Sequence, residues 1–304
     1  MEKKKHILVI GSVALDTIET PLGRCREVLG GSAVYFSVCA SLFAPVRLVA
    51  VVGEDFPSRH KTFLQKRKNV DIEGLVVQKG KTFRWEGRYG WDFGNAETIA
   101  THLNVFAQFK PQIPKSYENS EYVFLANIDP ELQSGVLTQL RRPQLIVCDT
   151  MNFWIENKKK HLLRLLKKVD IFVLNESEAR QLSGEANIAK AARAIMSFGP
   201  KSLIVKKGEH GAIMFTKDAV FCVPAYLLEE VFDPTGAGDT FAGGFLGYLA
   251  SVGKITTTTL KQALIYGNIM ATFAVNDFSL HCLGSINRGE VKKRYQKFRK
   301  YSCF

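Results

Sequence analysis

From residue 122 to residue 223, short apolar segments alternate with amphipathic ones, and this regular alternation restricts the chain to few folds. The apolar segments have the length of strands, and the segments between them have the length and periodicity of helices. The expected strands are Tyr122–Ala126, Leu145–Cys148, Ile171–Leu174, Ser202–Lys206, Ala212–Phe215 and Val220–Val223. The expected helices between them are Pro130–Leu140, Phe153–Leu166, Ser177–Leu182 and Ile188–Phe198. Repeated β-α units predict an α/β fold in three layers, with helices on both faces of a mostly parallel central sheet.

The first 92 residues are expected to add strands to this sheet and to form a small β lid. Ile7–Ile10 and Val46–Val52 are predicted strands, with an apolar helix, Ala33–Phe43, between them. Residues 17–28 are interrupted by Pro21 and Gly23, which favours short strands or a loop over a helix. Residues 72–91 predict hairpins with one aromatic face, in which Gly74–Gln78 and Thr82–Tyr89 flank a Lys79-Gly80 turn. We expect a lid over a site, an edge hairpin being the alternative.

The C-terminal part predicts three further helices, Phe241–Val252, Leu260–Val275 and Arg288–Arg299. The composition, 46% apolar and 23% charged, is typical of a globular protein with a substantial core. No apolar run reaches the roughly 18 residues of a membrane helix, and the basic start passes at once into a predicted strand rather than a signal peptide. The six scattered cysteines form no CxxC pair and indicate neither a disulfide framework nor a zinc site. A cytoplasmic location is expected.

The net charge of +12 raises the question of a nucleic-acid partner. The lysines and arginines are dispersed, however, in short runs near the N-terminus, at 158–160 and at 292–300. The sequence has no aromatic RNA-binding signature and no helix-turn-helix pattern. A basic surface that attracts phosphorylated ligands is the simpler interpretation, and no nucleic-acid partner is expected.

The stretch Val231–Phe245 is a polar, Gly-rich turn that runs into an apolar helix. Gly236 and Gly238 allow the backbone to approach a ligand, and the free N–H groups at a helix start bind anions. A carboxylate, Asp239, is unexpected in such a turn unless it has a function such as taking a proton from an attacking hydroxyl. The alternative is an ordinary acidic residue in a first helical turn, and the residue types alone leave both open.

The run Asp233-Pro-Thr-Gly-Ala-Gly-Asp-Thr-Phe-Ala-Gly-Gly-Phe245 resembles the C-terminal signature of the ribokinase-like (PfkB) family of carbohydrate and nucleoside kinases. The resemblance implies one ribokinase-like kinase domain over residues 1–304, with lid strands inserted at about 17–29 and 72–92. It implies transfer of the γ-phosphoryl group of ATP to a hydroxyl of a sugar or sugar-like molecule. Asp239 is then the general base, and the N–H groups of Gly236, Ala237 and Gly238 stabilise the phosphoryl oxygens.

The same resemblance implies a nucleotide and metal site. Asn175 and Glu178 match its N-x-x-E segment, which helps to hold Mg²⁺ on the donor phosphates, often through water. The residues expected to bind the nucleotide are Lys207, Gly208, Gly211, Thr235 and Asn268. A monovalent cation is a further option within the family. Without the other motifs, the turn at 207–211 would be read as a plain hairpin turn.

At the acceptor end, the resemblance implies that Asp16 binds sugar hydroxyls and that Gly30 and Gly31 let the sugar pack on the backbone. The remaining expected acceptor-binding residues are Ser32, Tyr35, Arg88, Asp149 and Asn152. Tyr35 departs from the family pattern, in which an asparagine stands near this position. That departure puts simple ribose specificity in doubt and allows an aromatic or less polar acceptor.

Two other readings stay open. A nucleoside is the second candidate acceptor, because of Tyr35 and the aromatic lid segment. A non-catalytic sugar- or nucleotide-binding protein on the same scaffold is the third, although both the base and the anion hole are intact. A Rossmann dehydrogenase would need G-x-G-x-x-G after the first strand, which Gly11–Asp16 lacks. The lid sheets of this family often pair, so a homodimer through the lid is also an expectation.

Overall fold

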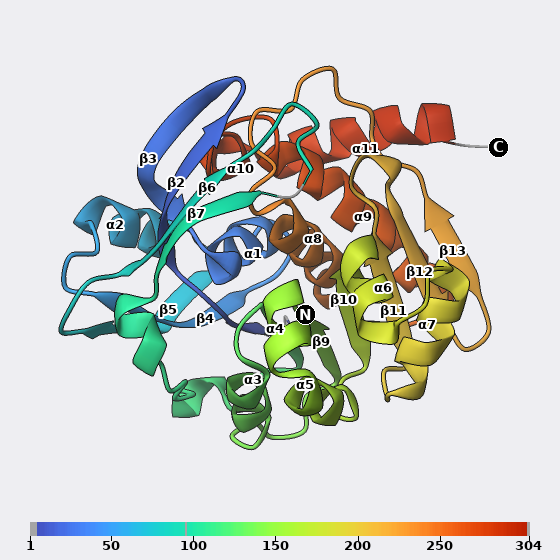
Figure 1. The fold of residues 1–304 in the computed structure, drawn as a ribbon, viewed down its shortest axis with the longest axis horizontal. Coiled ribbons are helices and arrows are strands. Elements are labelled where there is room, and N and C mark those ends of the chain that lie inside the picture. Colours follow the sequence, from blue (N-terminus) through green and yellow to red (C-terminus); the bar gives the residue numbers. More distant parts are fainter. Residues whose placement is uncertain (1–4, 95, 303–304) are drawn as a thin grey trace.

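The computed structural model describes residues 5–94 and 96–302, and two β-sheets form its framework (Figure 1). The larger sheet has nine strands in the order β13-β12-β11-β10-β9-β8-β1-β4-β5. Pairing from β11 to β5 is parallel throughout, and β12 and β13 are antiparallel. The strands are β1 (Ile7–Ile10), β4 (Val46–Gly53), β5 (Val70–Gln78), β8 (Tyr122–Leu125), β9 (Leu145–Asp149), β10 (Ile171–Asn175), β11 (Ser202–Lys206), β12 (Ala212–Thr216) and β13 (Val220–Val223).

Helices cover both faces of this sheet. One layer consists of α1 (Ser32–Ala40), α8 (Ala237–Val252), α9 (Thr257–Ala274), α10 (His281–Ser285) and α11 (Arg288–Ser302). The other consists of α3 (Pro130–Leu137), α4 (Asn152–Asn157), α5 (Lys159–Leu166), α6 (Glu176–Ser183) and α7 (Ile188–Ser197). Side chains of β1 alternate between the two cores: Ile7 and Val9 pack with the first layer, and Leu8 and Ile10 with the second. The three-layer α/β prediction is confirmed.

A second, smaller sheet has four strands in the order β3-β2-β6-β7, at the upper left of Figure 1. Its strands are β2 (Ala14–Thr20), β3 (Gly23–Gly30), β6 (Phe83–Arg88) and β7 (Glu97–His102). β2 pairs antiparallel with β3 and parallel with β6, and β7 closes the sheet antiparallel to β6. Only three residues separate the end of β1 from the start of β2. The second sheet therefore begins directly beside the carboxyl edge of the main sheet.

The predicted hairpin between Gly74–Gln78 and Thr82–Tyr89 is wrong. β5 pairs parallel with β4 as an edge strand of the main sheet, whereas β6 belongs to the second sheet. Thr82 fixes this crossing, because its hydroxyl and N–H both donate to Asp55, at 2.8 and 2.7 Å, and Gly53 N–H donates to its hydroxyl oxygen. The lid therefore does not include the first part of the predicted 72–92 segment, and it gains β7, which the sequence pattern did not indicate.

The predicted helix Phe153–Leu166 is divided in two. Lys158 has φ −131° and ψ 24°, so it ends α4 and precedes α5. A polar helix, α2 (Ser58–Lys66), lies between β4 and β5. The sequence pattern missed α10 and three 3-10 turns, η1 (Asn104–Gln108), η2 (Lys115–Tyr117) and η3 (Gly208–His210). Within the described ranges, no helix has both the length and the apolar character needed to cross a bilayer.

The strand order changes direction beside β1, since β4 and β5 lie on one side of it and β8 to β11 on the other. Ligands of open α/β sheets bind beyond the carboxyl ends of the strands at such a point. Asp149, Asn175 and Lys206 are the last residues of β9, β10 and β11. These three polar side chains therefore meet at the edge where a ligand is expected.

Candidate active site

The Gly-rich turn of 231–236 leads directly into the 16-residue helix α8. Gly236 is its N-cap, with a left-handed φ of 73°, and a Cβ there would lie 2.4 Å from ring atoms of Tyr35. A side chain is therefore excluded both by the backbone conformation and by the lack of space. Of the three predicted anion-binding N–H groups, that of Ala237 already donates to Pro234 O at 3.2 Å. Gly236 and Gly238 are the better placed donors.

Asp239 is the third residue of α8 and is partly buried. Burial raises the pKa of its carboxyl from 3.8 to about 7; the nearby Asp149 raises it further and Lys206 opposes the shift. A carboxylate with a pKa near neutrality has the proton affinity that a general base needs. The burial of Asp239 and the charges beside it are compatible with the predicted role.

Asp149 and Lys206 form an ion pair directly beside this helix start. Lys206 Nζ lies 3.1 Å from Asp149 Oδ2, and it would be 2.9 Å from a Cβ on Gly238. Side chains that alternate along β9 and β11 bring both to the face covered by α8, since Val147 and Ile204, two residues earlier, pack in that core. The ion pair therefore lies between the strand ends and the anion-binding turn.

Asn175 and Glu178 are held together as a capping box at the start of α6. Glu178 N–H donates to Asn175 Oδ1 at 2.8 Å, and Asn175 N–H donates to Glu178 Oε2 at 2.7 Å. Burial raises the pKa of Glu178 to about 7, while Lys206 lowers it and Asp149 raises it. The box fixes one carboxylate oxygen, and Oε1 stays available for another ligand.

At the acceptor end, Asp16 and the glycine pair are in close contact. Asp16 is 4% exposed, and a Cβ on Gly30 would lie 1.8 Å from its Oδ2. Burial raises the pKa of Asp16 to about 8; Asp233 contributes to the rise, and the N–H of Gly31, which donates to the carboxylate, opposes it. Asp16 is thus a largely protonated acid at neutral pH.

Ser32 and Tyr35 are both buried on α1. The Ser32 hydroxyl accepts from Ser12 N–H at 3.2 Å and lies 3.1 Å from the Ser12 hydroxyl, so it ties α1 to the end of β1. Tyr35 is 1% exposed and its ring lies against Gly236. Among the described residues, its hydroxyl has no hydrogen-bond partner, although Asp233, Asp16 and Tyr89 are near enough to raise its pKa along with burial.

Arg88 forms an ion pair on the second sheet. Its Nε donates to Glu19 Oε1 at 2.9 Å, and the side chain is 53% exposed. Register partners in neighbouring strands share a face. Arg88 is the partner of Glu19, and Trp85 is the partner of Asp16, which lies on the opposite face of β2 from Glu19. Arg88 thus lies on the opposite face of the sheet from Asp16, and this position does not support the prediction that it binds the acceptor. Trp85 lies on the side of Asp16 instead.

The predicted nucleotide residues lie in three places: the turn between β11 and β12, the Gly-rich turn with Thr235, and α9. Lys207 pairs with Glu176 at 3.7 Å, and its N–H donates to Gly211 O at 2.8 Å, so the segment from Lys207 to Gly211 is a tight turn between β11 and β12. Gly208 opens η3 within this turn. Asn268, on α9, donates from Nδ2 to Pro224 O at 2.9 Å, which anchors the chain after β13. Asn152 begins α4, three residues beyond Asp149.

Three residues at the site were not predicted. The motif indicates Lys207, whereas the alternation of side chains along β11 places Lys206 on the α8 face. Asp233 is 1% exposed and accepts N–H bonds from Thr235 at 2.8 Å and from Ser279 at 3.1 Å, which shapes the Gly-rich turn. The Tyr89 hydroxyl lies 3.1 Å from that of Thr235 and links the second sheet to the turn. The contacts of Tyr89 and Asp233 carry no sequence signal.

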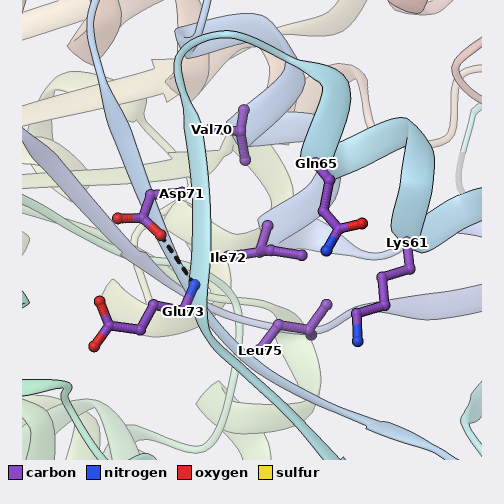
Figure 2. A pocket seen from close by; sticks show the side chains of 7 residues that line it. All are labelled: Lys61, Gln65, Val70, Asp71, Ile72, Glu73 and Leu75. Atoms are coloured by element: carbon purple, nitrogen blue, oxygen red, sulfur yellow. Dashed lines mark hydrogen bonds between the residues drawn. The ribbon is translucent and has the colours of Figure 1, made fainter.

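A surface hollow of about 510 Å³ lies elsewhere, between α2 and the edge strand β5 (Figure 2). Its lining residues are Lys61, Gln65, Val70, Asp71, Ile72, Glu73 and Leu75. Figure 2 shows Asp71 and Glu73 on the opposite side of the strand from the two α2 side chains, with Asp71 accepting from Glu73 N–H at 3.0 Å. None of the predicted site residues lines this hollow, so it is separate from the candidate active site.

Comparison with known proteins identifies the family. Residues 4–281 match the pfkB family of carbohydrate kinases. The chain belongs to the PfkB family. Its membership makes the protein an ATP-dependent phosphotransferase with an alcohol group of a sugar or nucleoside as the acceptor.

Relatives of this PfkB chain include nucleoside kinases. A cytidine kinase of Thermococcus kodakarensis is 34% identical over 250 residues, which cover 80% of this chain and 88% of the relative. The crystal structure of a nucleoside kinase of Methanocaldococcus jannaschii superposes with a TM-score of 0.78 at 23% identity, covering 97% and 99% of the two chains. A putative ribokinase II from E. coli, in complex with ATP and Mg²⁺, has the same TM-score at 19% identity over 96% and 99%. The last two comparisons show the fold.

Magnesium fits the residues at the strand ends of this PfkB chain. Asp149, Glu178 and Asp239 bring three carboxylates to one place with a single lysine, and burial raises the pKa values of two of them. Among the described residues, no group of three or more His, Cys, Asp or Glu side chains is placed to hold a metal ion by itself. Mg²⁺ commonly binds through one or two carboxylates, with water and substrate phosphates completing its shell. The free oxygen of Glu178 suits that mode.

Proposed function

We propose that this kinase uses Asp239 to deprotonate the acceptor hydroxyl as the γ-phosphoryl group is transferred. The observation that carries the proposal is the place of Asp239: in the first turn of α8, beside the ends of β9 and β11, with a pKa of about 7. Such a carboxylate is largely ionised just above neutral pH and still has substantial proton affinity. The N–H groups of Gly236 and Gly238 face the same turn and stabilise charge on the phosphoryl oxygens.

The acceptor is held at the other end of the site. Asp16 forms a hydrogen bond with a hydroxyl of the acceptor. Gly30 and Gly31 leave room for the sugar ring beside it. The second sheet, which leaves β1 next to Asp16, covers the acceptor and excludes water from the reaction. Water exclusion limits hydrolysis of ATP in place of transfer.

Mg²⁺ on the donor phosphates would be held by Glu178 Oε1, and Asn175 would position that carboxylate through the capping box. When bound, the ion neutralises charge on the transferring phosphates. Lys207, Gly208, Gly211, Thr235 and Asn268 stay as proposed nucleotide contacts, and a monovalent cation stays a prediction.

A nucleoside is the acceptor that we favour over a simple sugar. Trp85 is half-buried on the face of the second sheet that carries Asp16, and its ring lies over Gly87, where a Cβ would be 2.2 Å away. The indole Nε1–H of Trp85 donates to Thr98 Oγ1 at 3.3 Å, and an aromatic ring on this face of the sheet offers a stacking surface for a base. The similarity to a cytidine kinase at 34% identity supports the same class.

The experiment measures ADP release with ATP and Mg²⁺ across nucleosides, ribose, other sugars and polyols, for the wild type and for Asp239→Asn. We expect turnover with a nucleoside, lowered about 100-fold or more in the variant, as for loss of a general base. Near-wild-type turnover of the variant contradicts the role of Asp239. Turnover with ribose but with no nucleoside contradicts the acceptor class.

Two further proposals concern the whole molecule. The five described cysteines are free thiols, which suits a reducing cytoplasm. The second sheet carries exposed apolar side chains at Leu22 and Ile99, and Trp91, just after β6, is 80% exposed, which supports a homodimer through this sheet. Light scattering of the wild type and of Ile99→Lys tests the dimer: a monomeric wild type contradicts it.

A further inference from the structure

We propose that Lys206 binds the γ-phosphoryl group of ATP and is a second catalytic residue beside Asp239. This inference rests on the proposed function of the site. No motif assigned it, because the adjacent Lys207 was expected to be the lysine of the turn. The two lysines point to different places: Lys207 pairs with Glu176, whereas Lys206 reaches the start of α8.

The position of Lys206 is fixed by the main sheet. It is the last residue of β11, where it is the register partner of Asn175, so it stands level with the proposed metal-binding segment. Its side chain is 18% exposed and extends on the α8 face until Nζ contacts Asp149 Oδ2 at 3.1 Å. A Cβ placed on Gly238 would be 2.9 Å from Nζ, so the absence of a side chain at Gly238 leaves room for the ammonium group beside the helix start.

The ammonium group of Lys206 has hydrogen-bond donors to spare beside the start of α8. A helix N-terminus is a site of partial positive charge, so an ammonium group is unfavourable there unless negative charge lies between or beside them. Asp149, Glu178 and Asp239 supply that charge. Among the described residues, Asp149 is the one acceptor within hydrogen-bonding distance of Nζ, which leaves two of its three N–H donors for a ligand. A phosphoryl group bound by the N–H groups of the turn would be within reach of these two donors.

Lys206 remains charged in this environment. Burial alone lowers the pKa of its ammonium, but Asp149, Glu178 and Asp239 outweigh that effect and raise it above its ordinary value. Lys206 therefore acts as a hydrogen-bond donor and a fixed positive charge, not as a base.

The step balances without a further reactant. The acceptor oxygen forms a bond to the γ-phosphorus, and the bond from that phosphorus to the β-γ bridging oxygen breaks, so that ADP leaves. The hydroxyl proton goes to the carboxylate of Asp239. Lys206 keeps its protons and donates two hydrogen bonds to the non-bridging oxygens, where charge is concentrated during transfer.

The test compares Lys206→Met with Lys201→Met in the full-length protein. Lys201 is a matched control, because it precedes the same strand and also pairs with an aspartate, Asp170, at 2.8 Å, but on the surface at 81% exposure. Titration calorimetry with Mg²⁺ gives the Kd of ATP and of ADP for each variant, and steady-state assays give kcat. For Lys206→Met we expect the Kd of ATP to rise about 10-fold or more, as for loss of a charge-assisted hydrogen bond, with the Kd of ADP nearly unchanged. We expect kcat to fall about 100-fold or more.

Equal weakening of ATP and ADP would overturn the proposal, because only ATP carries the γ-phosphoryl group. Unchanged kcat would overturn it as well. Removing Lys206 alone leaves Asp149 buried without its cation, so a Lys206→Met/Asp149→Asn variant is measured too. It must show the same loss of discrimination between ATP and ADP for the proposal to stand.

Repeating the calorimetry in the Asp239→Asn background separates this proposal from that of the base. Nucleotide discrimination does not require turnover. If Asp239→Asn stays active, the role of the base fails, and loss of discrimination on adding Lys206→Met still supports the contact with the γ-phosphoryl group.

Discussion

Replacing Asp16 by asparagine should stabilise the protein while weakening acceptor binding, and the stabilisation should depend on pH. Burial raises the pKa of Asp16 from 3.8 to about 8, so the folded protein resists its ionisation and the unfolded chain does not. Stability associated with this group is fully present below pH 3.8 and is lost as the pH rises toward 8. Asparagine has nearly the same shape and cannot ionise, so it removes that loss.

The magnitude follows from the two pKa values. At 1.36 kcal/mol for each tenfold change in proton affinity, the ionisable group costs about 4 kcal/mol of unfolding free energy at pH 7 and about 2 kcal/mol at pH 5. The amide of asparagine needs hydrogen-bond partners of its own, which subtracts about 1–3 kcal/mol at both pH values. The difference between the two pH values, about 2–3 kcal/mol, is therefore the quantity to measure.

The assay is urea unfolding of wild type and Asp16→Asn at pH 5 and pH 7, with Asp218→Asn as an exposed control. We expect the advantage of Asp16→Asn over wild type to be larger at pH 7 by that amount, and no such change for the control. The KM for the acceptor should rise in Asp16→Asn, with the Kd of ATP unchanged. An equal effect of Asp16→Asn at both pH values would mean that Asp16 is already ionised in the folded protein, and the reasoning from burial would fail.

Three other predictions concern the catalytic turn and the metal. Because Asp239 must be ionised and its pKa is about 7, kcat should fall about tenfold for each pH unit well below 7; a flat profile from pH 5 to 7 in a pH–rate series argues against it as the base. Gly236→Ala should lower stability by more than Gly253→Ala in thermal unfolding. The two glycines cap opposite ends of α8 with φ of 73° and 70°, but only Gly236 would also bring a Cβ against Tyr35. Glu178→Gln retains the capping box and removes the charge, so it should raise the Mg²⁺ concentration needed for half-maximal activity by about tenfold or more at unchanged thermal stability. An unchanged Mg²⁺ requirement means that Glu178 does not hold the ion.

The layers of the fold were predictable because apolar periodicity reports how each segment is buried. The strands β8 to β13 and the helices between them lie within a few residues of the expected positions. Apolar periodicity does not report which strand a segment pairs with. β5 and β6 have the alternation of a hairpin but belong to different sheets, and the contacts of Thr82 with Asp55 that separate them leave no periodic pattern in the sequence. The break at Lys158 is likewise a local backbone event inside a helical pattern.

The candidate site was predictable where residues follow strands. Asp149, Asn175 and Asp239 lie at the strand ends and the helix start where the sequence placed them. The motif indicates Lys207, whereas Lys206, the last residue of the predicted strand Ser202–Lys206, is the lysine on the α8 face. The burial of Tyr35 and the outward direction of Arg88 depend on packing and sheet register, which a single sequence does not specify.

The hydroxyl pair of Tyr89 and Thr235 has a consequence for how an acceptor enters. It is a neutral hydrogen bond of 3.1 Å between the end of β6 and the Gly-rich turn. A bond of this kind contributes about 1 kcal/mol, less than twice the thermal energy at room temperature. An acceptor that hydrogen-bonds to either hydroxyl can therefore replace this bond at little cost.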